Sequence, residues 1–146
     1  MKSIVEGAMS TQSDKKEEHM EEFGTPKIMV AGVGGAGCNA VNRLANMGTS
    51  GAQLFAVNTD KQHLGIIDAD KKFLIGTGVT RGLGCGGFPE KGAEAAKESL
   101  QELKATLKGS DMVFVCAGLG GGTGTGASPV IAKLSKDLAA IVIGVV

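Results

Sequence analysis

The sequence predicts an α/β fold, a Rossmann-like three-layer arrangement whose parallel sheet carries helices on both faces and is truncated after the fifth strand. Short apolar runs of strand length alternate along the chain with segments of helical periodicity. Gly accounts for 24 of the 146 residues, well above the usual rate of about 7%, and most of the glycines gather in three clusters. Each cluster follows an apolar run, so all three are expected on the sheet edge where such folds bind ligands.

Five apolar runs supply the expected strands, at residues 28–31, 53–57, 72–75, 112–117 and 140–146. The run at 112–117 is continuously apolar, which is typical of a strand buried on both faces. The last run continues to the end of the chain without a turn residue, and it too is expected to be a buried strand. A complete domain seldom stops inside such a strand, so the chain is expected to be the first part of a longer protein.

The expected helices lie between these strands. The first covers residues 38–47, and Asp60 is placed to cap a short helical turn that runs through Leu64. A long glycine loop, 76–88, precedes the best-defined helix, 89–107, which Pro89 opens and Gly109 ends. A last helix begins near Gly124. Apolar stripes predict the buried faces of the last two helices, at Ala93, Ala96, Leu100, Leu103 and Leu107 and at Val130, Ile131, Leu134 and Leu138.

Composition and charge divide the chain into a flexible tail, 1–26, and a single domain, 27–146. Fifteen basic residues balance fifteen acidic ones, and five Phe are the only aromatic residues, which disfavours nucleic-acid binding. No apolar run reaches the length of a membrane span, and no secretory signal is present, so a cytoplasmic protein is expected. Cys38, Cys85 and Cys116 lack metal-ligand spacing and are expected to be small core residues in a reducing compartment.

The first glycine cluster has the pattern G-x-G-x-x-G at Gly32, Gly34 and Gly37, between an expected strand and an expected helix. Backbone N–H groups and the positive end of the helix dipole favour a phosphate there. The same pattern fits an NAD-binding oxidoreductase, although that enzyme needs an acid for the ribose where Asn58 stands. Tight strand-to-helix packing without any ligand is the remaining interpretation.

The third glycine cluster, residues 118–126, contains the segment GGGTGTG at residues 120–126. Its glycines permit close approach of the backbone to a ligand, and the hydroxyls of Thr123 and Thr125 offer hydrogen bonds. A dehydrogenase needs only one glycine loop of this kind. Two such loops, each at the start of a helix and on one sheet edge, favour a chain of phosphates held from both sides.

The GGGTGTG segment resembles the signature of the tubulin and FtsZ superfamily of GTPases. The segments GVGGAGCNAVN at 32–42, AVNTD at 56–60 and TRGLGCGG at 80–87 are similar to the FtsZ branch of that superfamily. The resemblance covers residues 27–146, and the opening residues, 1–6, are similar to archaeal members. Many members carry Gly at the positions of Ala36 and Cys38. Both residues are small, so nucleotide binding is expected to survive.

The resemblance implies a site for GTP or GDP with Mg²⁺. Its residues would be Gly35, Ala36, Gly37, Cys38 and Asn39 in a first phosphate loop, Asn58 and Asp60 beside the phosphates and the metal ion, Gly86 and Gly87 at the γ-phosphate, and Gly121, Gly122, Thr123, Gly124 and Thr125 in the signature loop.

The resemblance also implies a cell-division protein that polymerises head-to-tail into filaments of the mid-cell division ring and hydrolyses GTP between subunits. Its partners would be further copies of itself and membrane-tethering proteins, with no direct insertion into the membrane. In the family, the base-binding residues and a catalytic acidic loop come later in the chain, so this segment alone is expected to be inactive. An NAD-binding oxidoreductase and a truncated, non-enzymatic module that caps filaments are the alternatives.

Overall fold

The computed structural model describes residues 24–146, so residues 1–23 of the predicted tail lie outside the described part of the chain. One five-stranded sheet has the order β3-β2-β1-β4-β5 with every pairing parallel. Its strands are β1 (Ile28–Val33), β2 (Ala52–Asn58), β3 (Lys71–Leu74), β4 (Met112–Ala117) and β5 (Ile141–Val145). The parallel sheet is confirmed.

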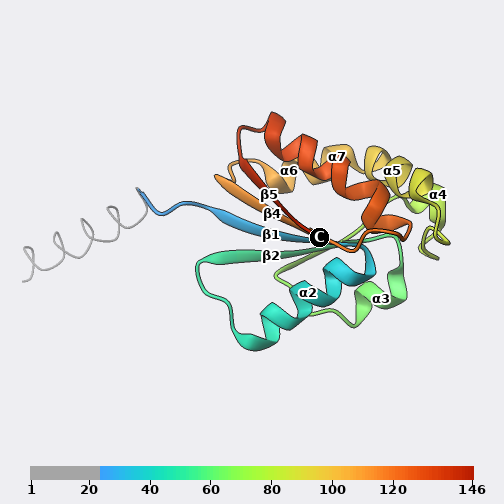
Figure 1. Cartoon of the computed structure of the whole chain (residues 1–146), viewed down its shortest axis with the longest axis horizontal. Coiled ribbons are helices and arrows are strands. Elements are labelled where there is room, and N and C mark those ends of the chain that lie inside the picture. Colours follow the sequence, from blue (N-terminus) through green and yellow to red (C-terminus); the bar gives the residue numbers. More distant parts are fainter. Residues whose placement is uncertain (1–23) are drawn as a thin grey trace, which may run out of the picture.

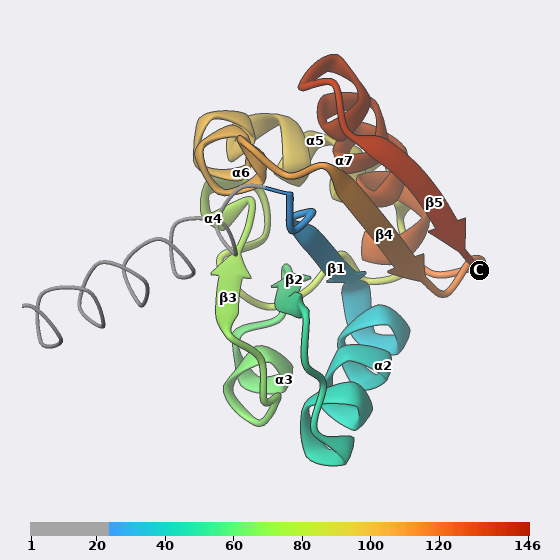
Figure 2. The same ribbon diagram turned by 90° about the vertical axis from the view of Figure 1, so that its left-hand side faces the viewer.

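Helices cover the sheet in two layers (Figures 1 and 2). One layer contains α2 (Gly34–Met47) and α3 (Lys61–Gly65). The opposite layer contains α4 (Thr77–Thr80), α5 (Pro89–Glu98), α6 (Leu100–Leu107) and α7 (Thr123–Asp137). The predicted three-layer fold is therefore confirmed, and consecutive strands of the sheet end at the same edge (Figure 1).

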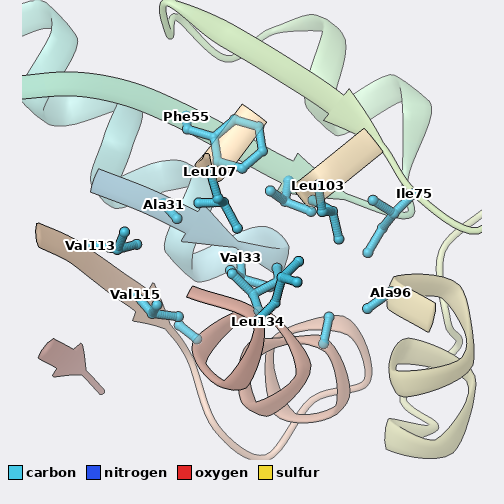
Figure 3. Packing of buried hydrophobic residues seen from close by; sticks show 14 of the residues in the cluster. Ala31, Val33, Phe55, Ile75, Ala96, Leu103, Leu107, Val113, Val115 and Leu134 are labelled. Atoms are coloured by element: carbon cyan, nitrogen blue, oxygen red, sulfur yellow. The ribbon is translucent and has the colours of Figure 1, made fainter. Parts of the chain in front are cut away.

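The alternation of side chains along β1 divides the core in two. Ala31 and Val33 belong to the larger apolar cluster, against α5, α6 and α7, while Val30 belongs to the cluster against α2. In the larger cluster Phe55 is fully buried, and its ring meets that of Phe73 edge-on, with centroids 4.8 Å apart. Figure 3 shows the side chains of this cluster between the sheet and the helices.

Two of the predicted helices have different bounds. The first begins at Gly34 rather than at residue 38: Val33 is still extended, and Gly34, with a φ of 73°, turns the chain directly from β1 into α2. The single helix expected over 89–107 is two helices, interrupted at Ser99. The Ser99 hydroxyl accepts a hydrogen bond of 3.1 Å from the N–H of Gly76, which ties this break to the loop after β3. That loop also contains α4, which the sequence pattern did not predict.

The strand β5 differs from the expectation of a buried strand. It pairs only with β4 and forms an edge of the sheet. Val142 packs against the larger core cluster, whereas Ile141 is 61% and Val145 47% exposed, because no helix of the described residues covers their face of the sheet. Within residues 24–146, no helix is both long enough and apolar enough to span a membrane.

Candidate phosphate-binding site

Two helices begin side by side at the carboxyl edge of the sheet. The chain passes from β1 directly into α2, and from the neighbouring strand β4 through a glycine loop into α7. The two starts touch: a Cβ atom on Gly34 would lie 2.7 Å from the backbone nitrogen of Gly124. Val33 and Gly122 occupy the N-cap positions, and neither supplies a side-chain cap. The first-turn N–H groups of both helices therefore depend on another acceptor, and an anion meets that requirement.

A cavity of about 300 Å³ lies at these two helix starts. Glycine backbone forms most of its wall, together with a few apolar side chains. The lining residues are Val33, Gly35, Ala36, Gly118, Leu119, Gly121, Gly122, Thr123 and Gly124. A larger cavity of about 610 Å³ lies at the opposite edge, around the starts of β1 and β2. It contains none of the three glycine clusters, and we place the candidate site at the smaller cavity, where the uncapped helices converge.

The glycines of the first motif divide into two groups by what surrounds them. A Cβ on Gly37 would lie well inside van der Waals contact of the Cys116 carbonyl oxygen and 3.0 Å from the carbonyl carbon of Gly32. Gly32 and Gly37 therefore serve the packing of α2 on the sheet. A Cβ on Gly35 would meet nothing within 4 Å, and Gly35 lines the cavity. Packing and ligand binding thus fall to different residues of one motif.

The threonines of the signature loop bond to other parts of the protein. The hydroxyls of Thr123 and Thr59 lie 2.7 Å apart, and each is 3.4 Å from the Cys85 sulfur. The Thr125 hydroxyl accepts a hydrogen bond of 3.0 Å from the N–H of Gly120. The contacts of Thr123 join the loops that follow β2, β3 and β4. Because both threonine hydroxyls are engaged, the backbone N–H groups remain as the donors of the signature loop toward the cavity.

The polar residues after β2 are held by a local network. Asn58 is 3% exposed, and its Oδ1 accepts hydrogen bonds from the N–H groups of Thr59 at 2.8 Å and Asp60 at 3.3 Å. One carboxylate oxygen of Asp60 accepts the N–H of His63 at 3.0 Å. Asp60 is therefore the N-cap of α3, which confirms the predicted capping role.

Cys38 lies behind the first phosphate loop instead of facing the cavity. It is fully buried, with its sulfur 3.4 Å from the Val57 carbonyl oxygen and 3.5 Å from that of Gly32. Burial raises the pKa of the Cys38 thiol to about 11, although the hydrogen bond to Val57 opposes the shift, so the thiol stays neutral. Burial likewise raises the pKa of Cys116. All three cysteines are free and buried, as the sequence predicted.

The second glycine cluster, which lies in the loop 76–88, reaches the site through its contact with the signature loop. Gly86 and Gly87 lie in an exposed segment with φ values of 59° and 82°, which favour glycine. A Cβ on Gly122 would lie 3.3 Å from the carbonyl carbon of Gly87 and 2.6 Å from the Cβ of Cys85. The two glycine loops are therefore in direct contact beside the cavity.

The structure brings only part of the predicted set to the cavity wall. Those residues are Gly35, Ala36, Gly121, Gly122, Thr123 and Gly124. Gly37 and Cys38 lie in the packing beneath the wall. The other predicted residues do not line the cavity, namely Asn39, Asn58, Asp60, Gly86, Gly87 and Thr125. Two lining residues, Leu119 and Gly118, were not predicted, and their only signal was their place inside the third cluster. His63, which bridges Asn39 and Asn58, was not predicted either.

Comparison with known proteins gives one consistent family. The GTPase-domain model of the Tubulin/FtsZ family matches residues 27–146. The protein named cell division protein FtsZ 2 of Methanocaldococcus jannaschii is 54% identical over 143 residues, or 98% of this chain and 37% of that protein. The protein named cell division protein FtsZ 1 of Pyrococcus abyssi is 58% identical over 120 residues, or 82% of this chain and 32% of that protein.

Solved structures agree with these relatives. An empty FtsZ dimer of M. jannaschii matches with a TM-score of 0.81 and 52% identity, over 88% of this chain and 37% of that one. A GTPγS-bound protofilament of CetZ2 from Haloferax volcanii matches with a TM-score of 0.71 and 32% identity, over 81% of this chain and 39% of that one. The chain thus spans between 32% and 39% of the length of these relatives.

Proposed function

The chain belongs to the Tubulin/FtsZ family, and on that premise we propose that its cavity holds the phosphates of GTP or GDP. One observation carries the proposal: two helices of 14 and 15 residues start at one cavity without a side-chain cap. Their first-turn N–H groups and the positive ends of their dipoles favour an anion between them. Gly35 and Gly121 leave the wall open, since an added Cβ at either would meet no atom within 4 Å.

The residues present also fit a magnesium ion that arrives with the nucleotide. Within residues 24–146, no cluster of three His, Cys, Asp or Glu side chains could hold a metal ion by itself. Mg²⁺ commonly binds through one or two carboxylates together with substrate phosphates, so a cluster is not needed. Asp60 is the acidic residue among the candidates, and its second carboxylate oxygen would be the protein's ligand. The metal would offset the negative charge of the phosphates.

For the whole protein we propose self-association into head-to-tail filaments of the mid-cell division ring, with GTP hydrolysed between subunits. Support comes from relatives named as cell division proteins and from solved structures described as a dimer and a protofilament. The partners proposed for the whole protein are further copies of the chain and membrane-tethering division proteins. Residues 1–146 alone are proposed to bind nucleotide without hydrolysing it, because such catalysis depends on positioning groups on both sides of the phosphates.

Calorimetric titration of the chain with GTP, GDP and NADH tests the binding proposal. GTP and GDP should bind in competition with each other, and NADH should not bind. Tight binding of NADH without competition from GTP would instead support the dinucleotide interpretation of the first motif. For catalysis, phosphate release from GTP should not exceed the blank, and turnover that Thr123→Ala abolishes would contradict the proposed inactivity.

A further inference from the structure

The larger cavity, of about 610 Å³, takes no part in the proposed nucleotide site, and its wall is basic. We call it the amino-edge groove, because it lies around the starts of β1 and β2 and beside the end of α6. Three of its lining residues are lysines, Lys27, Lys71 and Lys108, and none is acidic. The groove therefore carries a local positive charge on a chain whose charges balance as a whole.

The register of the sheet explains why a groove forms there. β1 pairs with β2 from Ala52 onward, whereas β3 pairs with β2 only from Phe55 onward, opposite Lys71. The first residues of β2 therefore extend past the start of β3. Gln53 lies two residues before the buried Phe55, so it points to the same face of the sheet, where α6 ends at Leu107. The groove lies between this face and the end of α6.

The polar groups of the groove lack partners. Within residues 24–146 none of the three lysines forms an ion pair. The neighbouring carboxylates bond to the backbone instead: Asp111 accepts the N–H of Lys27 and Asp70 that of Leu54, each at 2.7 Å. Ser110 lines the groove and is only 9% exposed, and its hydroxyl has no hydrogen-bond partner in the described part of the chain. A hydroxyl buried to this extent normally has a partner, and an anion in the groove would supply one.

The end of α6 selects among anions. The carboxyl end of a helix carries partial negative charge, which opposes a compact and highly charged group such as a phosphate. The lysines come from three separate elements, the starts of β1 and β3 and the end of α6, and Ile28, Ala52 and Ala105 add apolar surface to the wall. Separate ammonium groups beside apolar surface suit several carboxylates spaced along a partly apolar chain. An acidic peptide has this chemistry.

We propose that the amino-edge groove binds the chain's own acidic segment, residues 17–22, with the sequence EEHMEE. Its four glutamates complement the three lysines, and Met20 can contact the apolar wall. Thr25 and Pro26 line the groove, and Glu22 lies only three residues before Thr25, which is at most about 11 Å of extended chain. A tether this short gives an effective concentration on the order of 1 mM, so weak ion pairs suffice for binding. The proposal does not depend on the proposed function.

Backbone ¹H–¹⁵N spectra of the full chain test this contact, with a synthetic peptide of residues 10–24 in the same buffer as the reference. At low salt the amide signals of residues 17–22 should differ from those of the peptide. In about 1 M salt, where the screening length falls to about 3 Å, they should coincide with those of the peptide.

Substitutions in the groove locate the contact. Lys27→Gln, Lys71→Gln and Lys108→Gln should each lower the bound-to-free ratio of the segment by about two- to fivefold, as expected of partly exposed ion pairs. Ser110→Ala changes no charge and should lower the ratio by at least about fivefold, because it removes a buried donor to a carboxylate. Lys133→Gln is the matched control: this exposed lysine lies on α7 and does not line the groove, so the ratio should not change. Circular dichroism checks that each variant folds.

Four results would overturn the proposal. Peptide-like signals for the wild-type segment at low salt would show that no contact forms. Equal release by Lys133→Gln, or an unchanged ratio in a folded Ser110→Ala, would show that the segment does not bind in the groove. Signals that change with protein concentration would show that it binds a second copy of the chain. None of these results bears on GDP binding, which is proposed for the opposite edge of the sheet.

Discussion

Two glycines at the start of α2 should respond to the same substitution in opposite ways. Gly35 lines the cavity, and a Cβ added there would meet nothing within 4 Å. Gly37 lies two residues further along the helix, and its Cβ would press on the Cys116 carbonyl group and lie 3.0 Å from the carbonyl carbon of Gly32. Gly35→Ala and Gly37→Ala therefore separate the two roles that one motif combines.

The expected magnitudes follow from these surroundings. Alanine forms helix better than glycine by about 1 kcal/mol in a helix interior and by less in the first turn, so Gly35→Ala should leave the free energy of unfolding unchanged or slightly raised. At Gly37 the atoms that crowd the new methyl group belong to the backbone of β1 and β4, which cannot rotate away. Overpacking of this kind costs about 1–3 kcal/mol and sometimes more, and we expect a net loss of about 2 kcal/mol.

For GDP affinity the two variants should rank the other way, with the larger loss in Gly35→Ala. The methyl group of Gly35→Ala projects where the phosphates are proposed to lie, so GDP affinity should fall at least about tenfold, or about 1.4 kcal/mol. Gly121→Ala, on the other side of the cavity, should behave like Gly35→Ala, because its Cβ also meets no atom within 4 Å.

Urea denaturation followed by circular dichroism, with GDP calorimetry on the same samples, measures both quantities. The reasoning is refuted if Gly35→Ala binds GDP like the wild type, or if Gly37→Ala is as stable as the wild type.

Three further predictions concern the interior. Thr59→Val leaves the buried Thr123 hydroxyl without its 2.7 Å partner and should lower the free energy of unfolding by about 1–3 kcal/mol in urea, whereas Thr59→Ser should lose less. Phe55→Ala removes a fully buried ring and should cost about 3–5 kcal/mol in the same assay; a loss below about 1 kcal/mol would contradict the described packing. Burial raises the pKa of Cys38 from 9.0 to about 11, so the unfolded chain releases that proton first, and the free energy of unfolding should fall as pH rises from 9 to 11. Cys38→Ala should show a shallower decline over that interval, and an identical decline would count against the shift.

The strands and most of the core could be predicted because their signals are local. The apolar run at residues 112–117 is β4 with the predicted bounds, and Leu103 and Ile131 are fully buried as their helical spacing predicted. The break at Ser99 could not be predicted in the same way, since it accompanies a hydrogen bond to Gly76, 23 residues away in sequence. The exposure of β5 depends on which helix covers which face of the sheet, and no strand encodes that by itself.

The candidate site was predictable to a similar extent. Motif spacing located both glycine loops, but it treated all motif glycines alike, whereas Gly37 packs against the sheet and Gly35 lines the cavity. The threonine hydroxyls of the signature loop looked available to a ligand, and Thr123 in fact bonds to Thr59, 64 residues earlier. His63 carried no signal because a single histidine on a short helix is recognisable only through the two asparagines that it contacts in three dimensions.

The strand order has a consequence for the synthesis of this protein. β1 is made first and lies at the centre of the sheet, with β2 on one side and β4 on the other. After β2 has left the ribosome, about 50 residues must follow before β4 exists, which takes about 3–10 s at typical rates of translation. During that time the backbone groups on one edge of β1 have no hydrogen-bonded neighbour. The helices that pack on one face of its apolar side chains are also not yet all made. Slow codons between residues 59 and 111 would prolong this exposed state, and they would increase the risk that nascent chains pair with one another.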